Sequence, residues 1–181
     1  MGFLDKIFSA GKPNPDKLKA IIMDSNASYP DRRNAIDKIA TIDQDFLLEF
    51  VNEQYPGNYM DDTKLYAISC IQDNSVLCDL ALDADLETKY KRCAMNHITN
   101  ESYLEKFALN TNNSVDGNSA VLKIQNEDII RNIAQNAKYD EVRESAVRHK
   151  LSDKHILEDI KNNDSSEVVR ESAAKKLDKL N

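Results

Sequence analysis

Histidine and cysteine are the side chains of this sequence whose chemistry best suits metal binding or nucleophilic catalysis. The histidines are His97, His149 and His155, and none of them belongs to the HExxH pattern of a zinc protease. We therefore expect histidines on the surface or in turns, and the sequence predicts no metal site.

The cysteines lie among apolar residues in stretches with helical periodicity. Cys70, Cys78 and Cys93 form no CxxC pair and are odd in number, which argues against a disulfide framework and favours a reducing, cytoplasmic compartment. We interpret them as small apolar side chains that fill the core. The motifs GxGxxG, GxxxxGK[ST] and GxSxG are absent, so the sequence predicts a protein that is not an enzyme and has no cofactor.

Two groups of residues suit contact with a partner. The segment 52–62 interrupts the pattern of the chain and holds Tyr55 and Tyr59, and exposed tyrosines are good contact residues. Polar residues also follow a series of apolar pairs. They are Glu49, Asp79, Glu105, Arg131, Glu158 and Asp159. The segment is either loop filler or a binding loop, and the polar row is either a solvated face or a groove for a basic peptide.

The elements that must position these residues are repeats. Residues 142–151 read VRESAVRHKL and residues 169–177 read VRESAAKKL. The alanine and the following aliphatic residue recur every 26 to 32 residues or so, as in a helical repeat array. The pairs are Ala35/Ile39, Ala67/Ile71, Ala94/Ile98, Ala120/Ile124, Ala146/Leu151 and Ala173/Leu177.

A second apolar group follows each pair after a short polar break, with the i, i+1, i+4 spacing of one helix face. The breaks contain residues that cap helices: Asp45, Asp73 or Asn74, Asn100, Asn126 and Asp153. Each unit is thus predicted to be a helix, a tight turn and a second helix. Asn14 and Pro15 predict the start of a further helix ahead of the repeats.

The VRESA-type helix starts and the LSDKHILEDI-type second helices (residues 151–160) resemble those of the HEAT-like repeat family. The resemblance covers about residues 31–181. It implies an all-α fold, a right-handed, armadillo-like superhelical stack of about five and a half two-helix repeats. It also implies that the second helices line the concave side, which would then be mostly acidic.

A cation precedes nearly every repeat alanine by three residues. The row consists of Arg32, Lys64, Lys91, Arg143 and Arg170, with Gly117 in the remaining place. An anion-binding ladder is one interpretation. The resemblance implies the other, which we favour: exposed ion pairs between repeats, each worth roughly 0–1 kcal/mol.

The chain divides into a short amphipathic segment, residues 1–13, and one domain, residues 14–181. The segment is either a cap on the first unit or a weak contact with a membrane surface through residues 1–8. No apolar run approaches the roughly 18 residues that span a bilayer, so no transmembrane segment is expected.

The net charge of −7, concentrated in residues 31–110, disfavours nucleic-acid binding. We therefore expect a non-enzymatic protein–protein interaction scaffold that contacts a basic protein or peptide through the acidic concave surface and the 52–62 loop. One alternative is a lyase-like chaperone for a cofactor-bearing partner. Another is a HEAT-like DNA-base glycosylase, which the acidic charge and the absence of tryptophan disfavour.

Overall fold

The structure is a computed structural model that describes residues 14–55 and 59–180. Within these ranges the chain is all-α, with twelve helices and no strand. The predicted amphipathic segment, residues 1–13, lies outside the described residues. None of the described helices is long and apolar enough to cross a membrane.

The even-numbered helices share one start signal. They are α2 (Pro15–Met23), α4 (Gln44–Asn52), α6 (Asn74–Leu82), α8 (Glu101–Asn110), α10 (Glu127–Asn136) and α12 (Lys154–Asn163). Each follows an Asn or Asp whose side-chain oxygen accepts a hydrogen bond from a backbone N–H of the first turn. The prediction of Asp45 as a cap was wrong. Asp43 caps α4 by accepting from the N–H of Phe46 at 3.1 Å, because the helix begins before Asp45.

The odd-numbered helices carry the repeat alanine. They are α3 (Tyr29–Ile39), α5 (Asp61–Ser69), α7 (Thr88–His97), α9 (Ser114–Lys123), α11 (Asp140–His149) and α13 (Glu167–Leu180). All six repeat alanines are buried, as are the aliphatic residues paired with them. A small side chain at this point lets neighbouring helices approach closely, so the predicted repeat is confirmed as a packing pattern.

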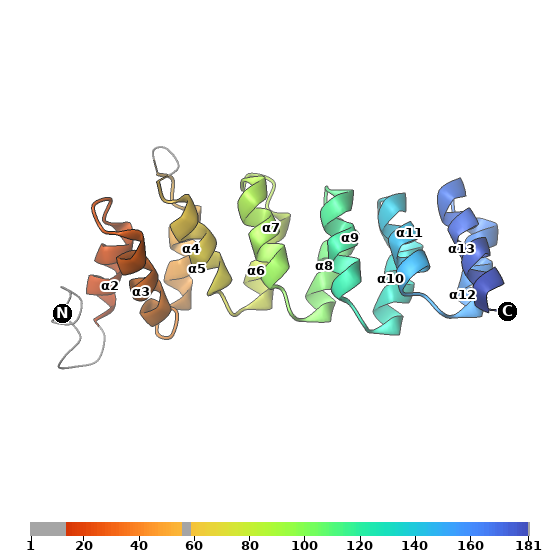
Figure 1. Cartoon of the computed structure of the whole chain (residues 1–181), viewed down its shortest axis with the longest axis horizontal. Coiled ribbons are helices and arrows are strands. Elements are labelled where there is room, and N and C mark those ends of the chain that lie inside the picture. The colour runs from red at the N-terminus through yellow and green to blue at the C-terminus, as the bar shows by residue number, and fades with distance from the viewer. Residues whose placement is uncertain (1–13, 56–58, 181) are drawn as a thin grey trace.

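Each even helix packs against the odd helix that follows it, and such a pair is called a layer below. Six layers follow one another in a single row from the N-terminal to the C-terminal end (Figure 1). The sequence predicted the opposite pairing, an alanine-bearing helix with the helix after it. The closest pairing is therefore shifted by one helix.

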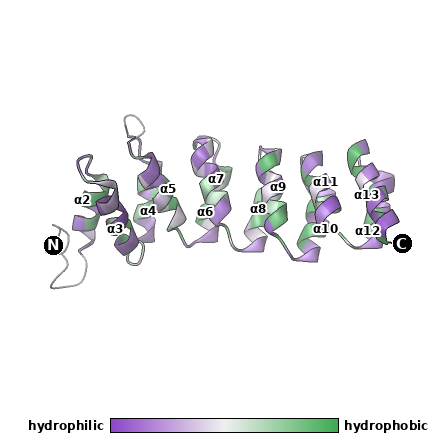
Figure 2. Ribbon diagram, in the orientation of Figure 1, coloured by the Kyte–Doolittle hydropathy of each residue, from purple (hydrophilic) through white to green (hydrophobic). Residues whose placement is uncertain are grey.

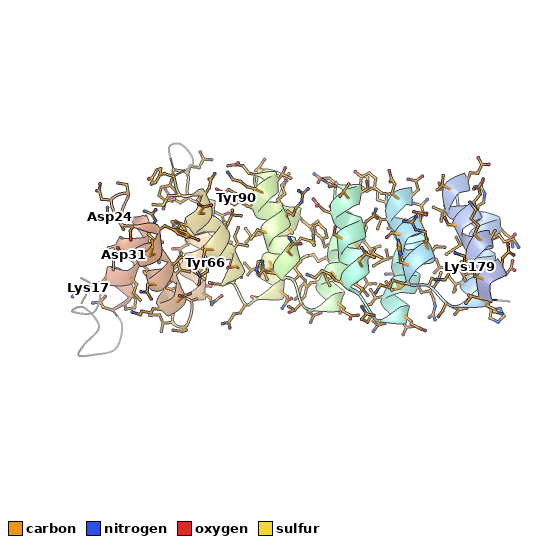
Figure 3. The ribbon with its side chains drawn as sticks, viewed as in Figure 1. Lys17, Asp24, Asp31, Tyr66, Tyr90 and Lys179 are labelled. Carbon is orange, nitrogen blue, oxygen red and sulfur yellow. The ribbon has the colours of Figure 1, made fainter. Side chains whose placement is uncertain are left out.

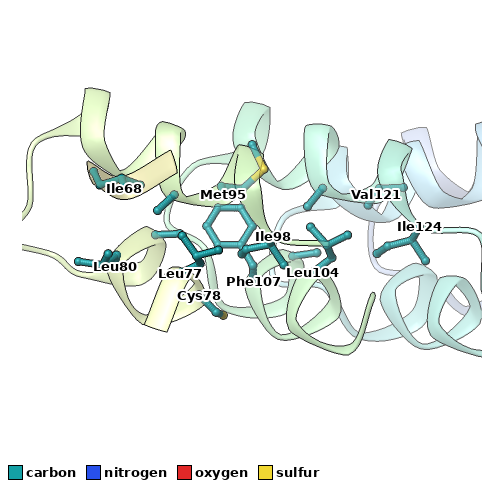
Figure 4. Packing of buried hydrophobic residues seen from close by; sticks show 14 of the residues in the cluster. Ile68, Leu77, Cys78, Leu80, Met95, Ile98, Leu104, Phe107, Val121 and Ile124 are labelled. Carbon is teal, nitrogen blue, oxygen red and sulfur yellow. The ribbon is translucent and has the colours of Figure 1, made fainter. Parts of the chain in front are cut away.

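The core is continuous from layer to layer. Odd helices contribute Ile68, Met95 and Val121, and even helices contribute Leu77 and Leu104, in one row of apolar contacts (Figure 4). Every helix shows both hydrophilic and hydrophobic residues, as expected for helices that bury one side (Figure 2). A layer cannot bury its apolar surface alone, so stacking supplies the missing burial.

The cations before the repeat alanines bind the backbone rather than forming a row of exposed ion pairs. Arg32 donates to the carbonyl of Ala27 at 2.7 Å, and Arg143 donates to that of Ala137 at 2.9 Å. These carbonyls belong to the segments that leave the preceding even helix, where helical carbonyls lack partners. Lys64, Lys91 and Arg170 bind carbonyls at equivalent places.

The prediction of exposed ion pairs at these positions was wrong. Arg32, Lys64 and Arg143 are buried, and among the described members of the row only Arg143 forms an ion pair, with Asp164 of the next layer. A buried cation needs hydrogen-bond partners, and the carbonyl ends of the even helices provide them.

Gly117 interrupts the row for a steric reason. A Cβ atom at this position would lie 2.7 Å from Cγ2 of Val142, which is buried in the next odd helix, α11. The close approach of α9 and α11 therefore requires the glycine here.

Candidate functional site

The loop between α4 and α5 is longer than most loops at the same end of the stack. This loop consists of residues 53–60, of which 56–58 are not described, whereas the loops at 111–113, 137–139 and 164–166 are short. A pocket of about 410 Å³ lies between this loop and residues 83–87, the loop between α6 and α7. We call it the loop pocket. Figure 3 places Tyr90 of α7 near this upper edge of the stack.

Carboxylates dominate the lining of the loop pocket. They are Glu53, Asp61, Asp83, Asp85 and Glu87. The pocket also holds one cation, Lys64, and Lys89 beside it pairs with both Asp61 and Glu87. In the described part of the chain, Glu53, Asp83 and Asp85 form no ion pair. The pocket is therefore strongly negative.

Two helices, α4 and α6, finish at the pocket. Their carbonyl ends already have cations, because Lys64 donates to Val51 of α4 and Lys91 donates to Ala84, just after α6. The negative potential of the pocket therefore comes mainly from its carboxylates.

Lys64 already serves the fold. Its ammonium group donates to the carbonyl oxygen of Val51 at 2.9 Å and also to that of Glu53. Burial lowers its pKa, and only 8% of the residue is exposed. Lys64 therefore holds the C-terminal end of α4, and its charge offsets part of the negative charge of Asp61, Glu87 and Glu53.

Two tyrosines form walls of the pocket. The hydroxyl of Tyr90 donates to Asp61 at 2.6 Å. Burial raises the pKa of Tyr90, and this hydrogen bond raises it further. The hydroxyl oxygen of Tyr55 is buried and has no hydrogen-bond partner among the described residues. Burial raises the pKa of Tyr55, so the hydroxyl stays protonated and can both donate and accept. Because this oxygen is closed off from solvent, a ligand in the pocket would meet other atoms of Tyr55 and not its hydroxyl.

The arrangement suits the binding of a cation better than proton transfer. The hydrogen bonds from Lys89 and Tyr90 lower the pKa of Asp61, so this carboxylate is a poor base at neutral pH. The carboxylates instead match an ammonium or guanidinium group. The tyrosine rings already attract Lys64, whose ammonium group lies 5.3 Å from the ring centroid of Tyr55 and 5.6 Å from that of Tyr90.

The structure brings some of the predicted contact residues together and separates others. Tyr55 and Tyr59 lie edge to face, with ring centroids 6.2 Å apart, and Tyr55 lines the loop pocket. Glu49, Asp79, Glu105 and Glu158 lie on α4, α6, α8 and α12, one to a layer. They form a row along the stack rather than one cluster.

Several residues of that row are already engaged. Asp79 pairs with Lys106 at 2.8 Å, and Glu158 pairs with Lys161 at 3.3 Å. Glu105 accepts a hydrogen bond from the amide of Asn132 at 2.6 Å. These contacts use part of the negative charge that the row would offer to a basic partner.

The sequence reasoning did not single out Asp83 and Asp85, which line the loop pocket. The spacing of the acidic residues could have predicted that they lie near Glu53. The acidic stretch 83–87 follows Glu53 by about one repeat length, and equivalent positions of successive repeats lie side by side in a stacked array.

The histidines and cysteines lie where the sequence suggested. All three histidines are exposed, Cys78 is buried, and Cys70 and Cys93 are half-buried against the core. Cys93 lies close to His97, with Sγ 3.9 Å from Nδ1, a proximity that the sequence reading overlooked. No group of three or more potential ligands converges within residues 14–55 and 59–180.

No protein-family model, no curated protein and no solved structure matches this chain. Its function must therefore be inferred from the loop pocket and the surfaces around it.

Proposed function

We propose that this protein is a non-enzymatic, cytoplasmic interaction module of the HEAT-like type. In this proposal its layers form a right-handed superhelix, and the loop pocket receives a basic side chain of a protein partner. The single observation that supports this most strongly is the composition of the pocket. Five carboxylates line it, and Lys64 and Lys89 supply only two positive charges against them.

An arginine side chain matches the pocket in its charge and in its hydrogen-bond donors. Its charge complements Glu53, Asp83 and Asp85, which have no ion pair in the described chain. Its planar guanidinium group can donate two parallel hydrogen bonds to one of these carboxylates. The rings of Tyr55 and Tyr90 already lie beside the ammonium group of Lys64, so they add little for a second cation. Lysine offers the same charge with fewer fixed hydrogen-bond directions, so we expect weaker binding.

The proposal can be tested with a Gly/Ser peptide that carries one central arginine. Its binding is followed by NMR titration of the isotope-labelled full chain, which detects weak binding and locates it. We expect shifts of residues around the loop pocket. The same peptide with citrulline in place of arginine keeps the shape and loses the charge, and we expect it not to bind.

Two triple variants test whether the peptide binds in the loop pocket. In the pocket variant, Glu53→Gln, Asp83→Asn and Asp85→Asn remove three charges, and we expect the arginine peptide to bind at least about tenfold more weakly. In the matched control, Glu49→Gln, Glu105→Gln and Glu158→Gln remove three charges from the row on the even helices. Equal binding of arginine and citrulline peptides, or loss of binding in the control variant alone, would overturn the proposal.

A further inference from the structure

A second hollow lies beside the loop pocket, on the side of the even helices. This groove between α4 and α6 has a volume of about 400 Å³. Its apolar lining consists of Leu48 of α4 and of Val76, Leu80 and Leu82 of α6. Leu80 is buried, whereas the other three are only half-buried and keep apolar surface in contact with solvent.

The groove lies where two neighbouring even helices pack loosely. α6 packs against α8, and α8 packs against α10, whereas α4 and α6 make few contacts, as do α2 with α4 and α10 with α12. The long loop at 53–60 follows α4 directly. The extra residues thus lie beside one of the places where the row of even helices is open.

The groove and the loop pocket adjoin each other. Asn52 and Asp83, at the ends of α4 and α6, line both hollows. A chain lying along this edge would meet apolar side chains on one side of Asn52 and Asp83, and carboxylates on the other. Two neighbouring side chains of one partner would therefore meet opposite environments.

We infer that the groove receives an aliphatic side chain from the same partner segment that places its basic side chain in the loop pocket. The occupant is a segment of another protein in which a leucine-like residue lies near an arginine or lysine. This inference rests on the proposed function, and it adds a second determinant of specificity. Apolar contact supplies affinity in the groove, while charge fixes the direction of the segment.

Charge decides between this occupant and two others. Asp79 and Asp83 line the groove, and the loop pocket next to it is acidic, so an anionic lipid surface would be repelled. A second copy of the chain would bring a further net charge of −7 to an already negative edge. A basic segment with an apolar residue is the partner that both hollows fit.

A positional scan tests the inference. The central-arginine Gly/Ser peptide receives one leucine at each position from four residues before the arginine to four residues after it. We expect a few adjacent positions on one side of the arginine to strengthen binding about tenfold, because burial of a leucine in an apolar site is of that order. Leucine on the opposite side should have no effect.

Variants of groove residues test whether the gain in affinity from leucine comes from contact with the groove. Leu48→Gln and Val76→Thr preserve side-chain size on half-exposed helical positions and remove apolar contact. We expect this double variant to abolish the leucine gain and to bind the leucine-free arginine peptide as the wild type does. Circular dichroism and the unfolding midpoint verify that the variant is folded.

The outcomes separate the two proposals. If the arginine peptide binds through Glu53, Asp83 and Asp85 but leucine improves binding equally at all positions, or at none, the groove inference is overturned while the loop pocket stands. If neither peptide binds, or binding ignores the three carboxylates, both proposals fail. A leucine gain that survives Leu48→Gln and Val76→Thr also overturns the groove inference.

Discussion

Arg143 and Asp164 join the last two layers of the stack through two hydrogen bonds. Nε and Nη2 of Arg143 donate to the two carboxylate oxygens of Asp164, at 2.8 and 3.0 Å. The side chains are only 11% and 6% exposed. Arg143 also donates to the carbonyl of Ala137 within its own layer, so one guanidinium group links the end of α10 to the end of α12.

Removal of Asp164 should therefore destabilise the protein strongly. We expect Asp164→Ala to lower the free energy of unfolding by roughly 3 kcal/mol, since it leaves Arg143 buried without its carboxylate. Urea denaturation at neutral pH measures the change. The control is Glu171→Gln, which breaks the exposed pair of Glu171 with Lys175 and should cost less than about 1 kcal/mol. Equal effects of the two variants would contradict this assignment.

The contribution of Asp164 should also depend on pH. Burial by itself raises the pKa of Asp164, but hydrogen bonds from Arg143 and from the N–H of Ser166 outweigh it and hold the pKa below its ordinary value. Its stabilisation is complete above the unfolded pKa of about 3.9 and is lost as the pH falls through the lower folded value.

We expect the difference in unfolding free energy between wild type and Asp164→Asn to be constant from neutral pH to about pH 5. It should then narrow toward the lowest pH at which the wild type remains folded. Urea denaturation across this range gives the profile. A difference that widens with acidification would show the opposite sign and disprove the assignment.

Gly117 offers a test of close helix packing. Alanine forms helices better than glycine by up to about 1 kcal/mol, yet its Cβ would lie 2.7 Å from Val142. We expect Gly117→Ala to destabilise the protein by roughly 1–2 kcal/mol, as overpacking does. In a Val142→Ala background only Cγ2 of Thr111, at 3.1 Å from the added Cβ, remains close, so the same change should cost clearly less. A double-mutant cycle of unfolding free energies measures the coupling, and strict additivity would contradict it.

Lys64 should act on stability rather than on anion binding. Lys64→Met removes the donor to the carbonyls of Val51 and Glu53, and an unpaired buried carbonyl costs about 1–3 kcal/mol. Lys106→Met, at an exposed lysine that pairs with Asp79, should change stability little. Thermal denaturation with and without phosphate completes the test, because an anion-binding Lys64 would make phosphate stabilise the wild type but not the variant.

The hydroxyl of Tyr55 should cost stability. Its oxygen is buried without a partner in the described chain, so we expect Tyr55→Phe to leave the free energy of unfolding unchanged or to raise it by up to about 1 kcal/mol. Urea denaturation measures the change. Tyr59→Phe is the control and should have little effect, since Tyr59 is 44% exposed. A clearly destabilised Tyr55→Phe variant would contradict this assignment.

Much of the fold could be predicted from the chain alone, because its signals are local. The repeated alanine and aliphatic pairs mark buried helix positions, and the caps Asn100, Asn126 and Asp153 mark helix starts. Periodicity could not reveal which neighbour each helix packs against most closely. Periodicity marks the buried face of a single helix, whereas the choice depends on which other helix covers that face in the folded chain.

The candidate site was only half visible in the sequence. The interruption at 52–62, with Tyr55, signalled a departure from the repeat. Glu53 and Asp83 come from different layers, and nothing local to either residue shows that they share a pocket.

The sequence by itself determined the helices, their caps and their buried faces, since these follow from nearest-neighbour periodicity and short-range hydrogen bonds. Only the tertiary structure decided which charged side chains are buried, which are paired and which are open to solvent. Stacking buried three cations against helix carbonyls, paired part of the acidic row, and left the carboxylates of the loop pocket open beside an apolar groove. The reason is that the burial and the pairing of a charged side chain depend on the groups around it in space, and those groups come from other repeats.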